Sequence, residues 1–253
     1  MASSLMWVAK QYAPFCTNMA SSRGAKKMWC IPNLDSEFVE RMEDLLSLYE
    51  KPLDANEPVV CLDEKPVQCL DEKRKTIRVQ NGSYRRDYEY IRRGTANVFC
   101  VVEPKAGRHF TRATLNRKKP AFARMVRRIA KSYPEAQTVH LVMDNLSTHT
   151  KKALTDTFGV VEGEALWSRF TVHYTPKHGS WLDQAEIEVS MFSRQCLGKR
   201  RIGSFKELQA ETAAWRRRVD RQRLTIDWKF TVADARRKFR YSRRRGRITW
   251  SGD

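Results

Sequence analysis

Two apolar runs, each closed by an acidic residue, constrain the fold of this chain more than any other feature. Val59–Leu62 is short, rich in β-formers and followed by Asp63, and Thr138–Met143 has the same character and is followed by Asp144. In α/β proteins, ligand sites gather at the carboxyl ends of neighbouring strands. The pattern therefore predicts two buried strands that present carboxylates at one edge of a sheet.

The segments around these runs alternate between helical and strand periodicity. The spacing of apolar residues predicts an amphipathic helix over 38–49, a strand over 97–102, a helix over 122–130, a short helix over 151–158, a strand over 169–174 and a helix over 181–197. Further helical signals lie at 208–219 and 231–239. The order predicts an α/β fold with a mixed sheet flanked by helices.

A third carboxylate is expected on the helix over 181–197. Its apolar residues form one arc when successive residues advance by 100°, and Glu186 and Glu188 stand just outside opposite borders of that arc. Three carboxylates without a cysteine or histidine requirement suit hard divalent cations. Geometry alone leaves the choice between the two glutamates open.

The charge of the chain indicates a polyanionic partner. Lys and Arg outnumber Asp and Glu by 48 to 29, which gives a net charge of +19 and a pI near 10.0. Clusters in the last forty or so residues are suited to phosphate contacts; the candidate DNA-binding residues are Arg216, Arg217, Arg218, Arg236, Arg237 and Lys238. The alternative is that these clusters form a solvated face.

Several classes of function lack a sequence signal. The six cysteines show no C-x-x-C pair, so neither a zinc site nor a disulfide framework is indicated. No apolar run is long enough to cross a bilayer, and no Walker loop, dinucleotide fingerprint or nucleophile elbow occurs. We expect a cytoplasmic protein that does not contact membranes.

Five segments resemble bacterial insertion-sequence transposases related to the Tc/mariner superfamily. They are Val59–Gln68, Arg86–Tyr90 with Gly94–Asn97, Asp144–Thr150, Tyr174–Leu182, and Ala185–Glu188 with Ser193–Leu197. The resemblance covers about 29–237 and implies a ribonuclease-H-like DDE catalytic domain. It places the catalytic, metal-binding acids at Asp63, Asp144 and Glu186, holding two Mg²⁺ or Mn²⁺ ions.

The same resemblance suggests supporting residues and two departures. Asn145, His149, His178 and Glu188 are candidates for positions that support the acids. For His149 and His178, simple solvation is an equal alternative. Position 183 is Asp where the family usually has Asn, and the separation of 42 (186 − 144) between the last two acids is longer than in eukaryotic relatives.

The expected domains are a poorly ordered arm (1–28), a linker helix (29–58), the catalytic domain (59–200) and a basic helical C-terminal extension (201–253). The helix-turn-helix region of the relatives has no counterpart in the arm, so we expect DNA binding without sequence preference.

The resemblance implies a nucleoid-associated bacterial transposase that cuts element ends and joins them to target DNA, with a homodimer on DNA as the expected assembly. The alternative is an inactive, truncated DNA-binding remnant. A ribonuclease-H-type nuclease on RNA-containing duplexes would share the fold and metals.

Overall fold

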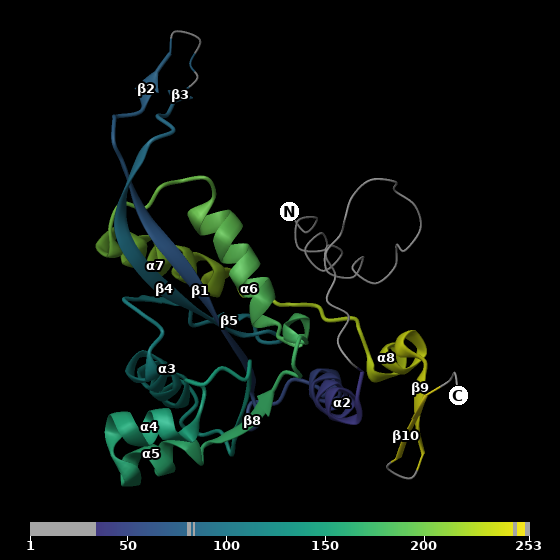
Figure 1. The fold of residues 1–253 in the computed structure, drawn as a ribbon. Coiled ribbons are helices and arrows are strands. Elements are labelled where there is room, and N and C mark those ends of the chain that lie inside the picture. Colours follow the sequence, from purple (N-terminus) through teal and green to yellow (C-terminus); the bar gives the residue numbers. More distant parts are fainter. Residues whose placement is uncertain (1–33, 80–81, 83, 245–246, 251–253) are drawn as a thin grey trace, which may run out of the picture.

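A mixed sheet forms the centre of the molecule (Figure 1). The computed structural model describes residues 34–79, 82, 84–244 and 247–250, so the expected arm over 1–28 lies outside the described residues. The strand order is β5-β4-β1-β7-β8, with β6 also paired to β4. The strands are β1 (Val59–Glu72), β4 (Tyr90–Glu103), β5 (Arg108–His109), β6 (Arg112–Thr114), β7 (Val139–Met143) and β8 (Phe170–Tyr174).

Strand β1 differs from its prediction because it does not end at the acids. Its parallel pairing with β7 runs from Val59–His140 to Leu62–Met143 and stops there. Its antiparallel pairing with β4 continues from Cys61–Val102 to Glu72–Tyr90. Asp63 and Glu64 therefore lie inside the strand, so the acids close the apolar run without ending the strand.

The long hairpin made by β1 and β4 projects from the body of the molecule (Figure 1). Strands β2 (Ile77–Arg78) and β3 (Tyr84–Arg85) pair with each other near its tip. On the hairpin, Asp71 forms a salt bridge of 3.0 Å with Arg93.

Helices cover both faces of the sheet. On one face, the side chains of Val60, Leu62 and Leu141 pack with α3 (Lys119–Lys131) and α4 (Lys151–Phe158), which α5 (Val160–Trp167) follows. On the other face, Cys61 and Val142 pack with α2 (Ser36–Glu50) and with the start of α6 (Ala185–Phe192). Further along that face, α6 and α7 (Phe205–Gln222) enclose a third cluster. The alternation of side chains along each strand produces this division.

The helix expected over 181–197 is divided into three parts. A 3₁₀ turn, η2, spans Ser180–Leu182, α6 spans Ala185–Phe192, and a wider π turn, η3, spans Ser193–Leu197. The side chain of Asp183 accepts a hydrogen bond of 2.8 Å from the amide of Ala185. A side chain that binds backbone amides in this way favours a helix start, so α6 begins four residues later than the periodicity predicts.

The C-terminal segment is not wholly helical. Helix α8 (Val232–Phe239) is followed by a hairpin of β9 (Tyr241–Arg244) and β10 (Arg247–Trp250), which the sequence did not predict. The segment docks on α2, because Glu43 accepts hydrogen bonds from Arg236 at 2.8 Å and from Arg243 at 3.2 Å. Within the described residues, no helix is both long and apolar enough to span a membrane.

Candidate active site

The strand register places Asp63 and Asp144 side by side. Leu62 and Met143 are the last partners in the parallel pairing of β1 with β7, and each aspartate is the next residue of its strand. Because Asp63 pairs with Cys100 across β4, it lies on the face that α6 covers. The two acids therefore stand at the carboxyl edge that the sequence predicts.

The first turn of α6 carries the third acid to the same place. The charge on Glu186 is one cause of a raised pKa at Asp63, and the charge on Asp144 is one cause of a raised pKa at Glu186. These mutual effects indicate that the three carboxylates lie in the same part of the molecule. The structure thus brings together Asp63, Asp144 and Glu186, which the resemblance had selected.

Glu188 occupies a different, closed environment. It is fully buried, and it accepts hydrogen bonds from Thr111 Oγ1 at 2.6 Å and from His109 Nδ1 at 3.0 Å. His109 Nε2 lies 3.1 Å from the carbonyl of Leu224, so both ring nitrogens face acceptors and the ring is cationic. Burial alone would lower the pKa of His109, but Glu188 raises it. Glu188 is therefore an internal ion-pair partner that fixes α6 against the β5–β6 segment.

Among the described residues, neither Asp63 nor Glu186 has a salt-bridge partner. Burial and the charge on Glu186 raise the pKa of Asp63 to about 7. Burial is also the main cause of the raised pKa of Glu186, which Lys65 partly opposes. A cluster of acids that raise one another's pKa is typical of functional sites that act on protons or cations.

Asp183 adds a fourth carboxyl group beneath this cluster. Its side chain is buried, and burial together with the charge on Asp63 raises its pKa well above the usual range. Its Oδ1 accepts from Ala185 N, whereas Oδ2 is buried without a hydrogen-bond partner among the described residues. A protonated carboxyl group has one donor and one acceptor end, much like an amide. Asp183 can therefore take the place of the Asn that the family usually has here.

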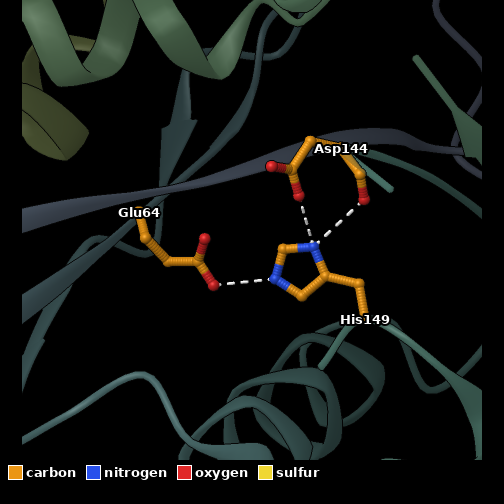
Figure 2. Close-up of side chains that lie close together, drawn as sticks. All are labelled: Glu64, Asp144 and His149. Carbon is orange, nitrogen blue, oxygen red and sulfur yellow. Dashed lines mark hydrogen bonds and ion pairs between the residues drawn. The ribbon is translucent and has the colours of Figure 1, made fainter. Parts of the chain in front are cut away.

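A buried histidine, His149, holds Asp144 from the side of α3, opposite the face that α6 covers (Figure 2). His149 Nδ1 lies 2.7 Å from Asp144 Oδ1 and 3.1 Å from the carbonyl oxygen of the same residue, while Nε2 lies 2.7 Å from Glu64 Oε1. The ring also stacks on Phe122 at a centroid distance of 4.6 Å. Tyr174 donates to the backbone carbonyl of His149 at 2.7 Å. His149 thus supports Asp144 rather than facing solvent.

Glu64, Asp144 and His149 form one compact group whose ligand-type atoms lie within 4.8 Å of one another. A histidine that binds a metal must offer a lone pair, whereas both nitrogens of His149 face oxygen acceptors and must carry protons. Burial would lower the pKa of His149, but hydrogen bonds to Asp144 and Glu64 raise it to about 10. The group is therefore an imidazolium between two carboxylates, and it holds Asp144 ionised, with a lowered pKa.

The other two expected supporting residues outside the buried pairs, Asn145 and His178, have no side-chain contact with the acids in the described part of the chain. Asn145 and His178 are both exposed. His178 has a positive φ of 62°, in the loop before η2. The structure gives neither side chain a contact with the three acids, so their roles stay predictions.

The basic residues predicted to bind DNA divide into two groups. Arg236 is bound to Glu43, and Arg237 pairs with Asp234 of the same helix at 2.5 Å. These contacts give both guanidinium groups internal partners, which the charge clusters in the sequence could not reveal. Arg217 and Arg218 are exposed on α7, and Arg216 is half-buried beside them; their role in DNA binding stays a prediction.

Sequence reasoning missed Glu64 and the chemical state of Asp183. Glu64 directly follows Asp63, and alternation along a continuing strand would have placed it on the opposite face. This alternation could have identified Glu64, but the acids were interpreted as the end of the strand.

Comparison with known proteins agrees with this geometry. The DDE superfamily endonuclease family matches residues 58–209, more than half of the chain. No curated protein matches.

Solved structures of the Mos1 mariner transposase are similar in fold. The paired-end complex with Mn is 18% identical with a TM-score of 0.52, and the strand transfer complex is 16% identical with a TM-score of 0.52; each match covers 85% of this chain and 65% of that chain. The pre-cleavage transpososome is 17% identical with a TM-score of 0.50 and covers 81% of this chain and 66% of that chain. At these identities the similarity confirms the ribonuclease-H-like fold, and the chain spans about two thirds of the length of those structures. From the family match, with the three acids converging at the strand edge, the chain belongs to the DDE superfamily endonuclease family.

Proposed function

We propose that this chain is the catalytic part of a DNA transposase, which hydrolyses a phosphodiester bond at the element ends and transfers the resulting 3′ hydroxyl to target DNA. The observation that carries the proposal is the convergence of Asp63, Asp144 and Glu186 on one face of the sheet, each close enough to alter the pKa of another. The Mos1 complexes, which contain transposon ends and in one case Mn, have the same fold. An inactive remnant would not need to retain this arrangement.

The donor set fits a pair of divalent cations. Asp63, Asp144 and Glu186 offer only oxygen ligands, which Mg²⁺ and Mn²⁺ prefer, and their uncompensated charge would be neutralised by cations. When bound, two such ions activate an attacking hydroxyl and stabilise the leaving oxygen. His149 keeps Asp144 ionised and oriented by holding Oδ1 at 2.7 Å. Asp183 anchors the first turn of α6 and so positions Glu186.

Positive charge near the acids suits a phosphodiester substrate. Lys65 lies close enough to lower the pKa of Glu186, and Arg117 close enough to lower that of Asp144. Both side chains would face the negative phosphates of DNA at the reacting bond. Further partners in this proposal are the element ends, the target DNA and a second copy of the chain.

The cleanest test is Asp63→Asn. A change at Asp144 would break its ion pair with His149 and disturb the fold. Asp63 has no cationic partner among the described residues. Its replacement by Asn therefore removes only the repulsion between carboxylates. We expect Mg²⁺-dependent nicking of a supercoiled plasmid to fall to background while the melting temperature is kept or raised. The matched control is Asp156→Asn, because Asp156 lies on α4 and pairs with Lys119 and Lys152.

The outcomes separate the alternatives. Nicking that disappears in EDTA and in Asp63→Asn, but persists in Asp156→Asn, supports the proposal. Equal nicking by a folded Asp63→Asn protein would exclude this site. Cleavage restricted to RNA–DNA hybrids would favour a ribonuclease-H-type activity over transposition.

A further inference from the structure

A group of arginines that have no acidic partner among the described residues lies between β6, α3 and the start of α7. Arg112 comes from β6, while Arg124 and Arg128 are four residues apart on α3 and so project from one side of that helix. All three line one hollow, together with Lys118. None of the described residues that line this hollow is acidic. We call the hollow that these four residues line the arginine hollow.

The charges in this hollow are not compensated within the described part of the chain. Elsewhere the arginines of the same region have partners, since Arg127 pairs with Glu162 at 2.9 Å and Arg108 with Glu103 at 3.8 Å. In contrast, Arg128 Nε is buried without an acceptor among the described residues. Burial, Arg216 and Arg112 all lower the pKa of Arg128. The protein thus holds like charges together, at a cost in stability that an anionic ligand would offset.

The sheet places the arginine hollow near the acids, because Arg112 pairs with Phe99 on β4 and Asp63 pairs with the next residue of β4, Cys100. Lys118 lines the hollow, and the preceding residue, Arg117, is close enough to Asp144 to lower its pKa. From Lys118 to Arg128 is ten residues, or about 15 Å along a helix axis. That distance corresponds to about four base-pair steps along the axis of a duplex, at roughly 3.4 Å each.

We infer that the arginine hollow is a second DNA contact, in which Arg112, Arg124 and Arg128 bind backbone phosphates of the duplex whose reacting bond lies at the acids. The inference rests on the proposed function that the chain acts on DNA. Guanidinium groups suit this task because their planar fork matches phosphate oxygens and stays charged. Phosphate contacts carry no base readout, so the hollow sets the position of the duplex rather than its sequence.

The test compares two triple variants that remove the same charge. The site variant is Arg112→Gln, Arg124→Gln and Arg128→Gln. The control variant is Arg127→Gln, Lys151→Gln and Lys152→Gln, whose native residues all have acidic partners. Binding of a labelled DNA duplex is measured by fluorescence anisotropy at several salt concentrations, in EDTA so that cleavage does not contribute. This readout is independent of nicking, so it remains decisive even if the wild type does not cut.

We expect the slope of log affinity against log salt concentration to be shallower by about two to three in the site variant, because each lost phosphate contact reduces its magnitude by about 0.9. Its affinity at 0.1 M salt should fall at least about tenfold, while the control variant stays near the wild type. If the triple site variant is unstable, Arg112→Gln with Arg124→Gln serves instead, since both side chains are exposed. Equal slopes for the site and control variants would overturn the inference, as would a loss confined to RNA duplexes.

Discussion

Replacing His149 tests the ion-pair network behind Asp144. The substitution His149→Gln keeps a planar, polar side chain but removes the positive charge between Asp144 and Glu64. In the ion pair between His149 and Glu64, the side chain of His149 is 0% exposed and that of Glu64 is 2% exposed. Breaking a buried pair by removing one partner usually costs about 3–5 kcal/mol, because the remaining charge is left uncompensated.

The pKa of His149 supports the same magnitude. Hydrogen bonds to the two carboxylates outweigh burial and raise this pKa from 6.5 to about 10. At 1.36 kcal/mol for each pH unit, the difference (10 − 6.5) corresponds to about 5 kcal/mol in favour of the charged form. A raised histidine pKa stabilises the fold fully below pH 6.5, and the contribution is lost as pH rises toward 10. Stability of the wild type should therefore fall over that range, whereas His149→Gln should lack this slope.

Urea unfolding followed by tryptophan fluorescence at pH 6.5, 8 and 9.5, in EDTA, measures both effects. The control is His173→Gln, because the carboxyl partner of His173, Asp44, is 54% exposed and such pairs contribute about 1 kcal/mol or less. We expect His149→Gln to lose at least about 3 kcal/mol at pH 6.5 and much less at pH 9.5. Losses equal to those of His173→Gln, or a pH slope identical to that of the wild type, would refute the assignment of a buried imidazolium.

Three further outcomes follow from the contacts of individual residues. Glu188→Gln should lower the free energy of unfolding by about 2–4 kcal/mol, by analogy with other buried pairs, whereas Glu186→Gln should leave stability intact and abolish metal-dependent nicking; urea unfolding and plasmid nicking of both variants decide this. Arg236→Gln should make the C-terminal segment more sensitive to limited proteolysis, because the guanidinium binds Glu43, and should barely change the salt dependence of DNA binding. The Asp183→Asn variant should have a higher free energy of unfolding than the wild type in EDTA, because burial raises the pKa of Asp183. The difference between the two proteins should grow above about pH 4 by up to about 1.4 kcal/mol per pH unit. A difference that stays constant in urea titrations between pH 4 and 8 would contradict this expectation.

Local patterns were sufficient for the central strands and two of the acids. Val59–Leu62 and Val139–Met143 are apolar enough to specify buried strands, and the residue after each run lies where the parallel pairing of β1 with β7 ends. The adjacency of Asp63 and Asp144 then follows from the parallel register.

The choice between Glu186 and Glu188 depends on contacts that no local pattern contains. Glu188 forms an ion pair with His109 and accepts a hydrogen bond from Thr111, which are 79 and 77 residues away in the chain. The family register selected Glu186 without that knowledge. The C-terminal hairpin was missed for a similar reason, because Tyr241 contacts Trp250 across the turn and bonds to Glu43 on α2.

The distribution of charge across the sheet favours one face for the proposed divalent cations. On the α3 face, Glu64 is balanced by His149 within the protein. On the α6 face, Asp63 and Glu186 have raised pKa values, and burial is the largest cause in each case. Asp144 joins the two sides, since Oδ1 is bound by His149 and its pKa is lowered. One carboxylate is therefore kept ionised by the protein, while the raised pKa values of its neighbours are ones that a bound divalent cation would lower.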